Sequence, residues 1–191
     1  MSQVPLIVVY DACVLYSAPL RDLFMYLALA DIYQAKWTKD IHDEWMRNLL
    51  KNRPDLTKGH LEKVREKMDT AIEGCLVQGY EGLIEKITLP DLDDRHVLAA
   101  AIQAHAQIII TFNLVDFPYK ATAKYNIEAQ HPDQFLRDLL EQVPAKVIQA
   151  VRKTRLSLKH PPKTAEAYLD ILINQSLPQT VKYLFDYKDL I

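Results

Sequence analysis

The sequence has little cysteine, little glycine and no excess of positive charge. Its 191 residues include two cysteines, four glycines, 23 basic residues and 25 acidic residues, which give a formal net charge of -2. Cys13 and Cys75 stand far apart, without the paired spacing of a metal-binding motif, so neither a disulfide framework nor a structural zinc site is expected. The charge balance supplies no global field for binding nucleic acid, and such contacts must come from local patches.

Long hydrophobic runs are also absent. The apolar run at residues 6–10 is too short for a membrane span, and no basic segment precedes it as in a signal peptide. We therefore expect a cytoplasmic protein without membrane contact. A hydrophobic fraction of 49% and a charged fraction of 25% are typical of a folded globular protein.

Short apolar runs alternate with longer helical patterns over most of the chain. Strands are expected at residues 6–10, 32–37, 83–90, 107–113 and 125–130, and helices at 19–31, 38–53, 56–73 and 94–106. This alternation predicts an α/β fold with a mainly parallel central sheet. From Pro144 onward only helical patterns occur, so we expect a main domain at residues 1–142 and a helical C-terminal extension at 143–191.

Acidic and polar side chains follow the expected strands. Asp11 comes directly after the first strand, and Glu44 lies in the first turns of a helix that follows a strand. Two later strands are followed by Asp91, Asp93 and Asp94 and by Thr111, Asn113 and Asp116. Because the carboxyl ends of parallel strands meet at one edge of a sheet, we expect these side chains to converge there.

Crowded carboxylates repel one another and raise their own pKa values, whereas a divalent cation reverses that penalty. Oxygen ligands without His or Cys indicate Mg²⁺ or Mn²⁺ rather than zinc. Each residue also has a structural alternative. Asp91 or Asp93 could cap a helix, Asp94 could complement the helix dipole, and Glu44 could pair with a residue three or four positions along its helix.

Four segments together resemble a known family. In order, "IVVYDACVLYSAP", "TKDIHDEWMRNL", "PDLDDRHVLAAAI" and "IIITFNLVDFP" are similar to the four acidic motifs of PIN-domain proteins, especially the VapC-type ribonuclease toxins of bacterial toxin-antitoxin systems. The resemblance spans residues 5–140. It implies an α/β/α sandwich and a catalytic, metal-binding set made of Asp11, Glu44, Asp94 and Asp116.

The resemblance implies further details of this site. Thr111 and Asn113 would support it, and Asp91 or Asp93 could share the metal role of the third motif. The activity implied is Mg²⁺-dependent (or Mn²⁺-dependent) endonucleolytic cleavage of RNA, such as tRNA, by metal-activated water. The partners implied are a cognate antitoxin of a type II system and a second copy in a homodimer.

A basic stretch follows the main domain. Residues 142–165 contain no acidic residue and hold Lys146, Arg152, Lys153, Arg155, Lys159 and Lys163. We expect Arg152, Lys153, Arg155 and Lys159 to be candidate RNA contacts, with a solvated helix face as the alternative. The helical patterns that follow would pack on the main domain or serve as a docking surface for an antitoxin or a second copy.

Two alternative classes of protein share part of this pattern. Phosphatases and receiver domains also place an aspartate after the first strand, and a noncatalytic module could have the PIN-like pattern. A phosphatase of the haloacid-dehalogenase type needs a second aspartate where this chain has Cys13, and a receiver domain needs a lysine that is absent after residues 107–113. A noncatalytic PIN-like module that binds RNA or protein is the remaining alternative. Cys13 and Ser17 are expected to shape the turn after the first strand. His96 is close enough to Asp94 to reach the edge of the site, but on a helix we expect it to pack or face solvent.

Overall fold

Four short strands form the sheet that positions the acidic residues. In the computed structural model, which describes residues 5–191, the strands are β1 (Ile7–Tyr10), β2 (Gln34–Lys36), β3 (Ile108–Ile110) and β4 (Glu128–Gln130). Their order is β2-β1-β3-β4, and all three pairings are parallel. The apolar run of β1 is explained by its central position, where Val8, Val9 and Tyr10 are fully buried. The predicted α/β fold with a parallel sheet is confirmed.

The chain divides into two compact units. The first unit holds the residues up to Tyr16 together with Tyr33–His131, and the second holds Ser17–Ile32 together with Pro132–Ile191. This grouping cuts the chain differently from the expected boundary between residues 142 and 143, which stays a prediction.

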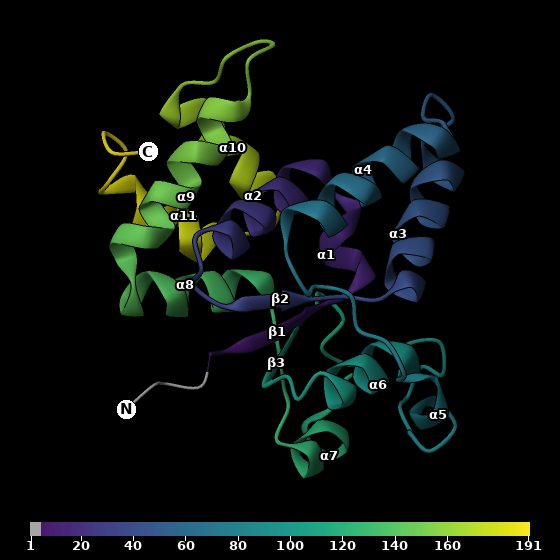
Figure 1. Ribbon diagram of the computed structural model, residues 1–191. Helices are drawn as coiled ribbons and strands as arrows, with labels where there is room; N and C mark the ends of the chain where they lie inside the picture. The colour runs from purple at the N-terminus through teal and green to yellow at the C-terminus, as the bar shows by residue number, and fades with distance from the viewer. Residues whose placement is uncertain (1–4) are drawn as a thin grey trace. The chain divides into compact units, whose positions relative to one another are not determined.

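Helices cover both faces of the sheet within the first unit. Figure 1 shows α1 (Ala12–Tyr16), α3 (Lys39–Asn52) and α4 (Lys58–Ala71) on one face, and α5 (Glu81–Ile84), α6 (Arg95–Gln103) and α7 (Tyr119–Thr122) on the other. A short 3-10 helix, η1 (Ala123–Tyr125), follows α7. The aromatic core lies beside β1, where the Tyr10 ring stacks on Trp37 with centroids 5.8 Å apart. The sandwich implied by the resemblance is therefore present.

One expected strand is wrong. Residues 83–90 hold no strand, and their first residues belong to the short helix α5. Ile87 and Leu89 are buried while Thr88 between them is exposed, so the alternation in the sequence does reflect burial. A strand also needs a partner strand to complete its backbone hydrogen bonds, and this segment pairs with none.

Helix α3 buries one apolar face and leaves its polar side chains, including Glu44, on another. Thr38 caps its start, because the threonine Oγ1 accepts a 3.1 Å hydrogen bond from the Ile41 backbone N–H. Ile41, Trp45 and Leu49 then form a buried stripe at helical spacing. The remaining face, which carries Glu44, is left for the site.

The second unit is entirely helical. It contains α2 (Ala18–Leu29), α8 (Pro132–Gln142), α9 (Pro144–Ser157), α10 (Ala165–Asn174) and α11 (Pro178–Phe185). Helix α2 packs on α9 and α8 on α11, and Phe24 stacks on Phe135 with ring centroids 6.2 Å apart. The helical character expected after Pro144 is confirmed. Within residues 5–191, none of these helices or those of the first unit combines the length and apolarity that crossing a membrane requires.

Candidate active site

Asp11 is a buried carboxylate at the carboxyl end of β1. Only 2% of the residue is exposed. Its Oδ2 accepts hydrogen bonds from Thr111 Oγ1 at 2.6 Å and from Cys13 Sγ at 3.0 Å. Burial raises the pKa of Asp11 above its ordinary value, the two hydrogen bonds lower it, and the charge of Glu44 raises it again. Asp11 is thus held by donors while it faces another acid.

Thr111 links this carboxylate to the loop after β3. The Thr111 Oγ1 that donates to Asp11 also accepts a 2.9 Å hydrogen bond from the Asn113 backbone N–H. Both of these hydrogen bonds are possible at once because a hydroxyl has one proton to donate and lone pairs to accept with. The threonine therefore fixes the start of the loop, and Asn113 itself remains exposed beside the cleft described below.

Asp94 stands at the N-cap position of α6, yet its side chain makes no capping hydrogen bond. Asp91 does not cap the helix either: its Oδ1 accepts a 2.8 Å hydrogen bond from the Asp93 backbone N–H, which forms a turn before α6 begins. Burial raises the pKa of Asp94 to about 7, with further contributions from the charges of Asp11, Asp116, Asp91 and Glu44. Asp94 thus lies at the centre of the electrostatic cluster.

Glu44 pairs across the site with a residue of α6. His96 Nε2 lies 3.1 Å from Glu44 Oε2, and the ring N–H donates because an ionised carboxylate can only accept. The other ring nitrogen, Nδ1, is buried without a hydrogen-bond partner among the described residues. The alternative in which Glu44 pairs along its own helix is not observed.

Four of these residues, Glu44, Asp94, His96 and Asn113, line a cleft in the first unit of about 680 Å³. Its polar lining comes from α3, from the segment that leads into α6 and from the loop after β3: Asp40, Asp43, Glu44, Arg47, Asn48, Asp91, Asp93, Asp94, His96 and Asn113. The lining is therefore dominated by negative charge. Of the four predicted metal-binding residues, Glu44 and Asp94 belong to this lining, and Asp11 and Asp116 do not.

The donor set fits a hard divalent cation in its chemistry. Asp11, Glu44, Asp94 and Asp116 offer carboxylate oxygens, which Mg²⁺ and Mn²⁺ prefer. Within residues 5–191, no three His, Cys, Asp or Glu side chains are gathered closely enough to hold one ion. Mg²⁺ keeps several waters and needs only one or two direct carboxylates, so a looser cluster of acids is compatible with it.

The sequence missed two contacts of the site. Cys13 was expected only to shape a turn, but its Sγ donates to Asp11 and lies 3.4 Å from the Phe112 backbone N–H, which donates to it. Burial and the Asp11 charge raise the pKa of this thiol, which keeps it protonated as a donor. His96 was expected to pack or face solvent. Its partner Glu44 lies 52 positions away along the chain, and no local spacing signals such a pair.

The basic stretch lies on α9 and the segment after it, in the second unit. Arg152, Lys153 and Lys159 are exposed, whereas Arg155 is half-buried and donates a 2.7 Å hydrogen bond to the Lys163 carbonyl. Three of the four candidate RNA contacts are therefore accessible, and Arg155 is partly committed to the local structure.

Comparison with known families agrees with this architecture. A family model described as "PIN domain" matches residues 7–114, more than half of the chain, and one described as "VapC50 C-terminal domain" matches residues 132–186. The chain therefore belongs to the PIN-domain family. The second match begins at Pro132, where the chain enters the second unit for the last time.

One relative resembles the chain in detail. Over 104 residues the chain is 39% identical to the "Putative ribonuclease VapC50" of Mycobacterium tuberculosis, a match that covers 53% of this chain and 59% of that protein. The match thus spans less than two thirds of the relative's length. No solved structure matches the chain.

Proposed function

We propose that this PIN-domain protein is a Mg²⁺-dependent or Mn²⁺-dependent endoribonuclease and the toxin of a type II toxin-antitoxin pair. The observation that carries the proposal is the acidic cleft lined by Glu44 and Asp94. It is supported by the charges of Asp11, Asp116 and Glu44, which add to burial in raising the pKa of Asp94 to about 7. The similarity to a protein named as a ribonuclease supports the same reading.

In this proposal the four carboxylates bind the ion and orient the substrate phosphate. When bound, the ion supplies charge neutralisation and an activated water for attack on a phosphodiester. Thr111 and Cys13 hold Asp11 in one orientation, and His96 holds Glu44. Asp94 would hold the ion in its ionised form, because metal ligation requires the ionised carboxylate. Asn113 and the neighbouring Asp91 and Asp93 assist from the rim.

The test is cleavage of RNA by the purified full-length chain after chelator treatment and return of Mg²⁺. Asp94→Asn keeps the shape of the side chain but removes its charge, and we expect the cleavage rate to fall by at least about 100-fold. Asp170→Asn is the matched control, since Asp170 is exposed on α10 and lies outside the cleft lining, and it should change the rate by less than about threefold.

Each outcome has a clear meaning. Equal activity of Asp94→Asn and the unmodified chain would reject the assigned site. RNA binding by the unmodified chain with no cleavage at any Mg²⁺ or Mn²⁺ concentration would instead favour the noncatalytic PIN-like module.

The basic residues of the second unit are proposed as sequence-independent RNA contacts. Arg152, Lys153 and Lys159 carry exposed charges, and Arg155 adds a fourth with part of its guanidinium engaged locally. Contacts of this kind neutralise phosphates without reading bases, so they add affinity rather than cleavage-site choice.

The remaining proposals concern partners and location. A structured RNA such as tRNA is the proposed substrate class, a cognate antitoxin the proposed protein partner, and a homodimer the proposed assembly. We place this activity in the cytoplasm, where the RNA substrate is found.

A further inference from the structure

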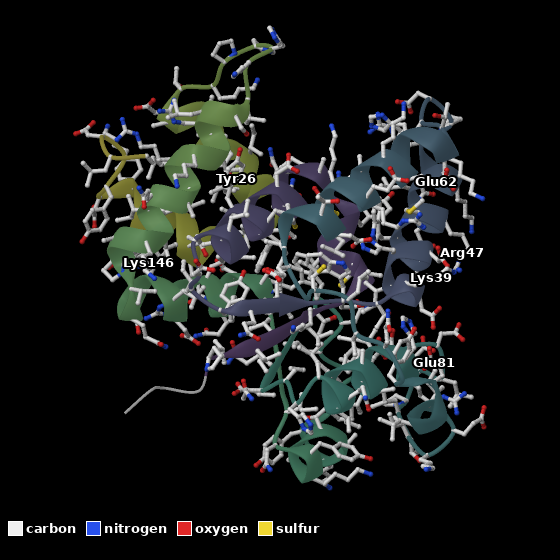
Figure 2. The ribbon with its side chains drawn as sticks, in the orientation of Figure 1. Tyr26, Lys39, Arg47, Glu62, Glu81 and Lys146 are labelled. Carbon is white, nitrogen blue, oxygen red and sulfur yellow. The ribbon has the colours of Figure 1, made fainter. Side chains whose placement is uncertain are left out.

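Arg47 is an unusual member of the acidic cleft. Apart from His96, which is bound to Glu44, it is the only basic side chain in the lining, and it is exposed. Its guanidinium has no hydrogen bond or ion pair with any residue in the described part of the chain. Figure 2 labels Arg47 on α3, the helix that also carries Lys39.

The isolation of Arg47 has a structural cause. Asp43 and Glu44 lie four and three residues before it on α3, where each would ordinarily form an ion pair with it. Asp43 is instead bound by Lys39 at 2.7 Å, and Glu44 by His96 at 3.1 Å. Both intrahelical partners are therefore engaged elsewhere, and the guanidinium remains available to a ligand.

The position of Arg47 defines what that ligand would be. Three residues along a helix correspond to a rise of about 4.5 Å, so Arg47 stands one turn from Glu44 on the same face. A guanidinium binds phosphate through two parallel N–H donors. Exposed Asn48, which also lines the cleft, adds an amide donor beside it.

We propose that Arg47, with Asn48 beside it, forms a phosphate-binding subsite for a nucleotide that flanks the bond to be cut. The proposal rests on the ribonuclease function proposed above. A polyanion that enters a cleft of carboxylates is repelled except where positive charge offsets them, and Arg47 supplies that charge next to the reacting position. Arg47 is therefore a substrate-binding residue of the cleft, and it acts on RNA affinity and orientation.

The test measures binding rather than cleavage. The probe is a short fluorescein-labelled single-stranded RNA pool of mixed sequence, which suits a phosphate contact because such contacts do not read bases. Anisotropy is followed with Ca²⁺ in place of Mg²⁺ across a series of salt concentrations, and a gel verifies that the RNA stays intact.

Arg47→Gln should weaken binding about tenfold and reduce the slope of log K against log salt by about 0.7, the amount for one phosphate contact on a single strand. Arg47→Lys should restore the slope because the charge returns. Lys67→Gln is the matched control: it removes the same charge from an exposed position of α4 outside the cleft lining, and its slope should equal that of the unmodified chain. In cleavage assays Arg47→Gln should raise KM while kcat changes by less than about threefold.

An unchanged slope in Arg47→Gln, beside clear binding by the unmodified chain, overturns the subsite and leaves the ribonuclease proposal intact. Equal losses in Arg47→Gln and Lys67→Gln also overturn it, because the effect would then be one of net charge. If the unmodified chain fails both to bind and to cleave RNA, the proposed function fails and the subsite fails with it.

Discussion

Two buried aspartates, one in each compact unit, have contrasting electrostatic surroundings. Asp133 in α8 is 3% exposed and receives three donors: the Gln179 backbone N–H on Oδ2, and the Thr180 backbone N–H and Oγ1 on Oδ1. Asp11 is 2% exposed and receives two side-chain donors, both on Oδ2. Asp133 binds the first turn of α11, whereas Asp11 faces other acids.

The difference separates a carboxylate that the fold satisfies from one that we propose to be functional. The N-terminus of a helix offers unpaired N–H groups and a favourable dipole, so a buried charge there is satisfied by the protein itself. At Asp11 burial and the nearby charge of Glu44 oppose ionisation, and hydrogen bonds from Thr111, Cys13 and the Ala12 backbone favour it. A bound cation would offset the remaining repulsion. Burial alone therefore does not identify a site. The signs of the neighbouring charges do.

Asp133→Asn should give the largest loss of stability. The amide loses the charge that strengthens three hydrogen bonds, and its NH₂ group faces donors, so the free energy of unfolding should fall by about 3 kcal/mol. Urea denaturation measures the loss, and hydrogen exchange should show faster exchange of the Gln179 and Thr180 amides. Asp138→Asn on the same helix, where the carboxylate accepts one exposed hydrogen bond from Gln134 Nε2, should cost less than about 0.5 kcal/mol. Comparable losses in both variants would contradict the capping role.

Asp94→Asn should stabilise the metal-free protein at high pH. The pKa of Asp94 rises from 3.8 to about 7 on folding, so the folded chain favours the protonated form. The stability that this form contributes is complete below pH about 4 and is lost as pH rises through about 7. A pKa difference of about 3 corresponds to about 4 kcal/mol, which solvent screening in the open cleft reduces to about 1–2 kcal/mol.

Thermal unfolding of the unmodified chain and of Asp94→Asn, both treated with a chelator, tests the predicted direction of the stability change at pH 4 and pH 8. The variant should be the more stable at pH 8 and equal to the unmodified chain near pH 4. Added Mg²⁺ should reduce the difference by stabilising the unmodified chain. A variant that is less stable at pH 8 would show that the neighbouring acids do not oppose the charge of Asp94.

Thr111→Val should have the smallest effect on stability, about 1 kcal/mol, because it removes one donor to Asp11 and one acceptor for the Asn113 N–H. RNA cleavage should fall more than stability does, by about tenfold, since Asp11 loses its orientation. Thr111→Ser keeps the hydroxyl and should behave like the unmodified chain in both assays. A serine variant as impaired as the valine variant would indicate that the methyl group, and not the hydroxyl, matters.

Much of the fold and the candidate site follows from local patterns. The buried runs of β1 and β3 mark central strands, and parallel topology brings the residues after them to one edge. Asp11 and Thr111 could therefore be placed together although 100 positions separate them. The acidic residues Asp91, Asp93 and Asp94 were instead expected after a strand at residues 83–90, which the structure does not contain, so this part of the cleft was predicted from a wrong element.

Other features depended on tertiary partners that the sequence does not reveal. The alternation at Ile87 and Leu89 correctly indicates burial, but whether a segment joins a sheet depends on a free neighbouring edge. The Glu44–His96 pair and the availability of Arg47 likewise depend on which acid meets which base across the cleft. In the sequence, Asp133 is an ordinary acidic residue in the first turn of its own helix. The backbone N–H groups that donate to it belong to the start of α11, which lies far along the chain.

The membership of α2 in the second unit has a consequence for synthesis on the ribosome. Helix α2 ends at Leu29, and its partners α8 and α9 begin only after residues 30–131 have been translated. At about 5–20 residues per second this takes on the order of 5–20 s. During that interval α2, whose Leu20, Leu23, Phe24 and Leu27 are buried in the finished protein, lacks α9 and the Phe135 ring on which Phe24 stacks. The nascent chain thus presents an apolar helix that chaperones can bind before the C-terminal helices cover it.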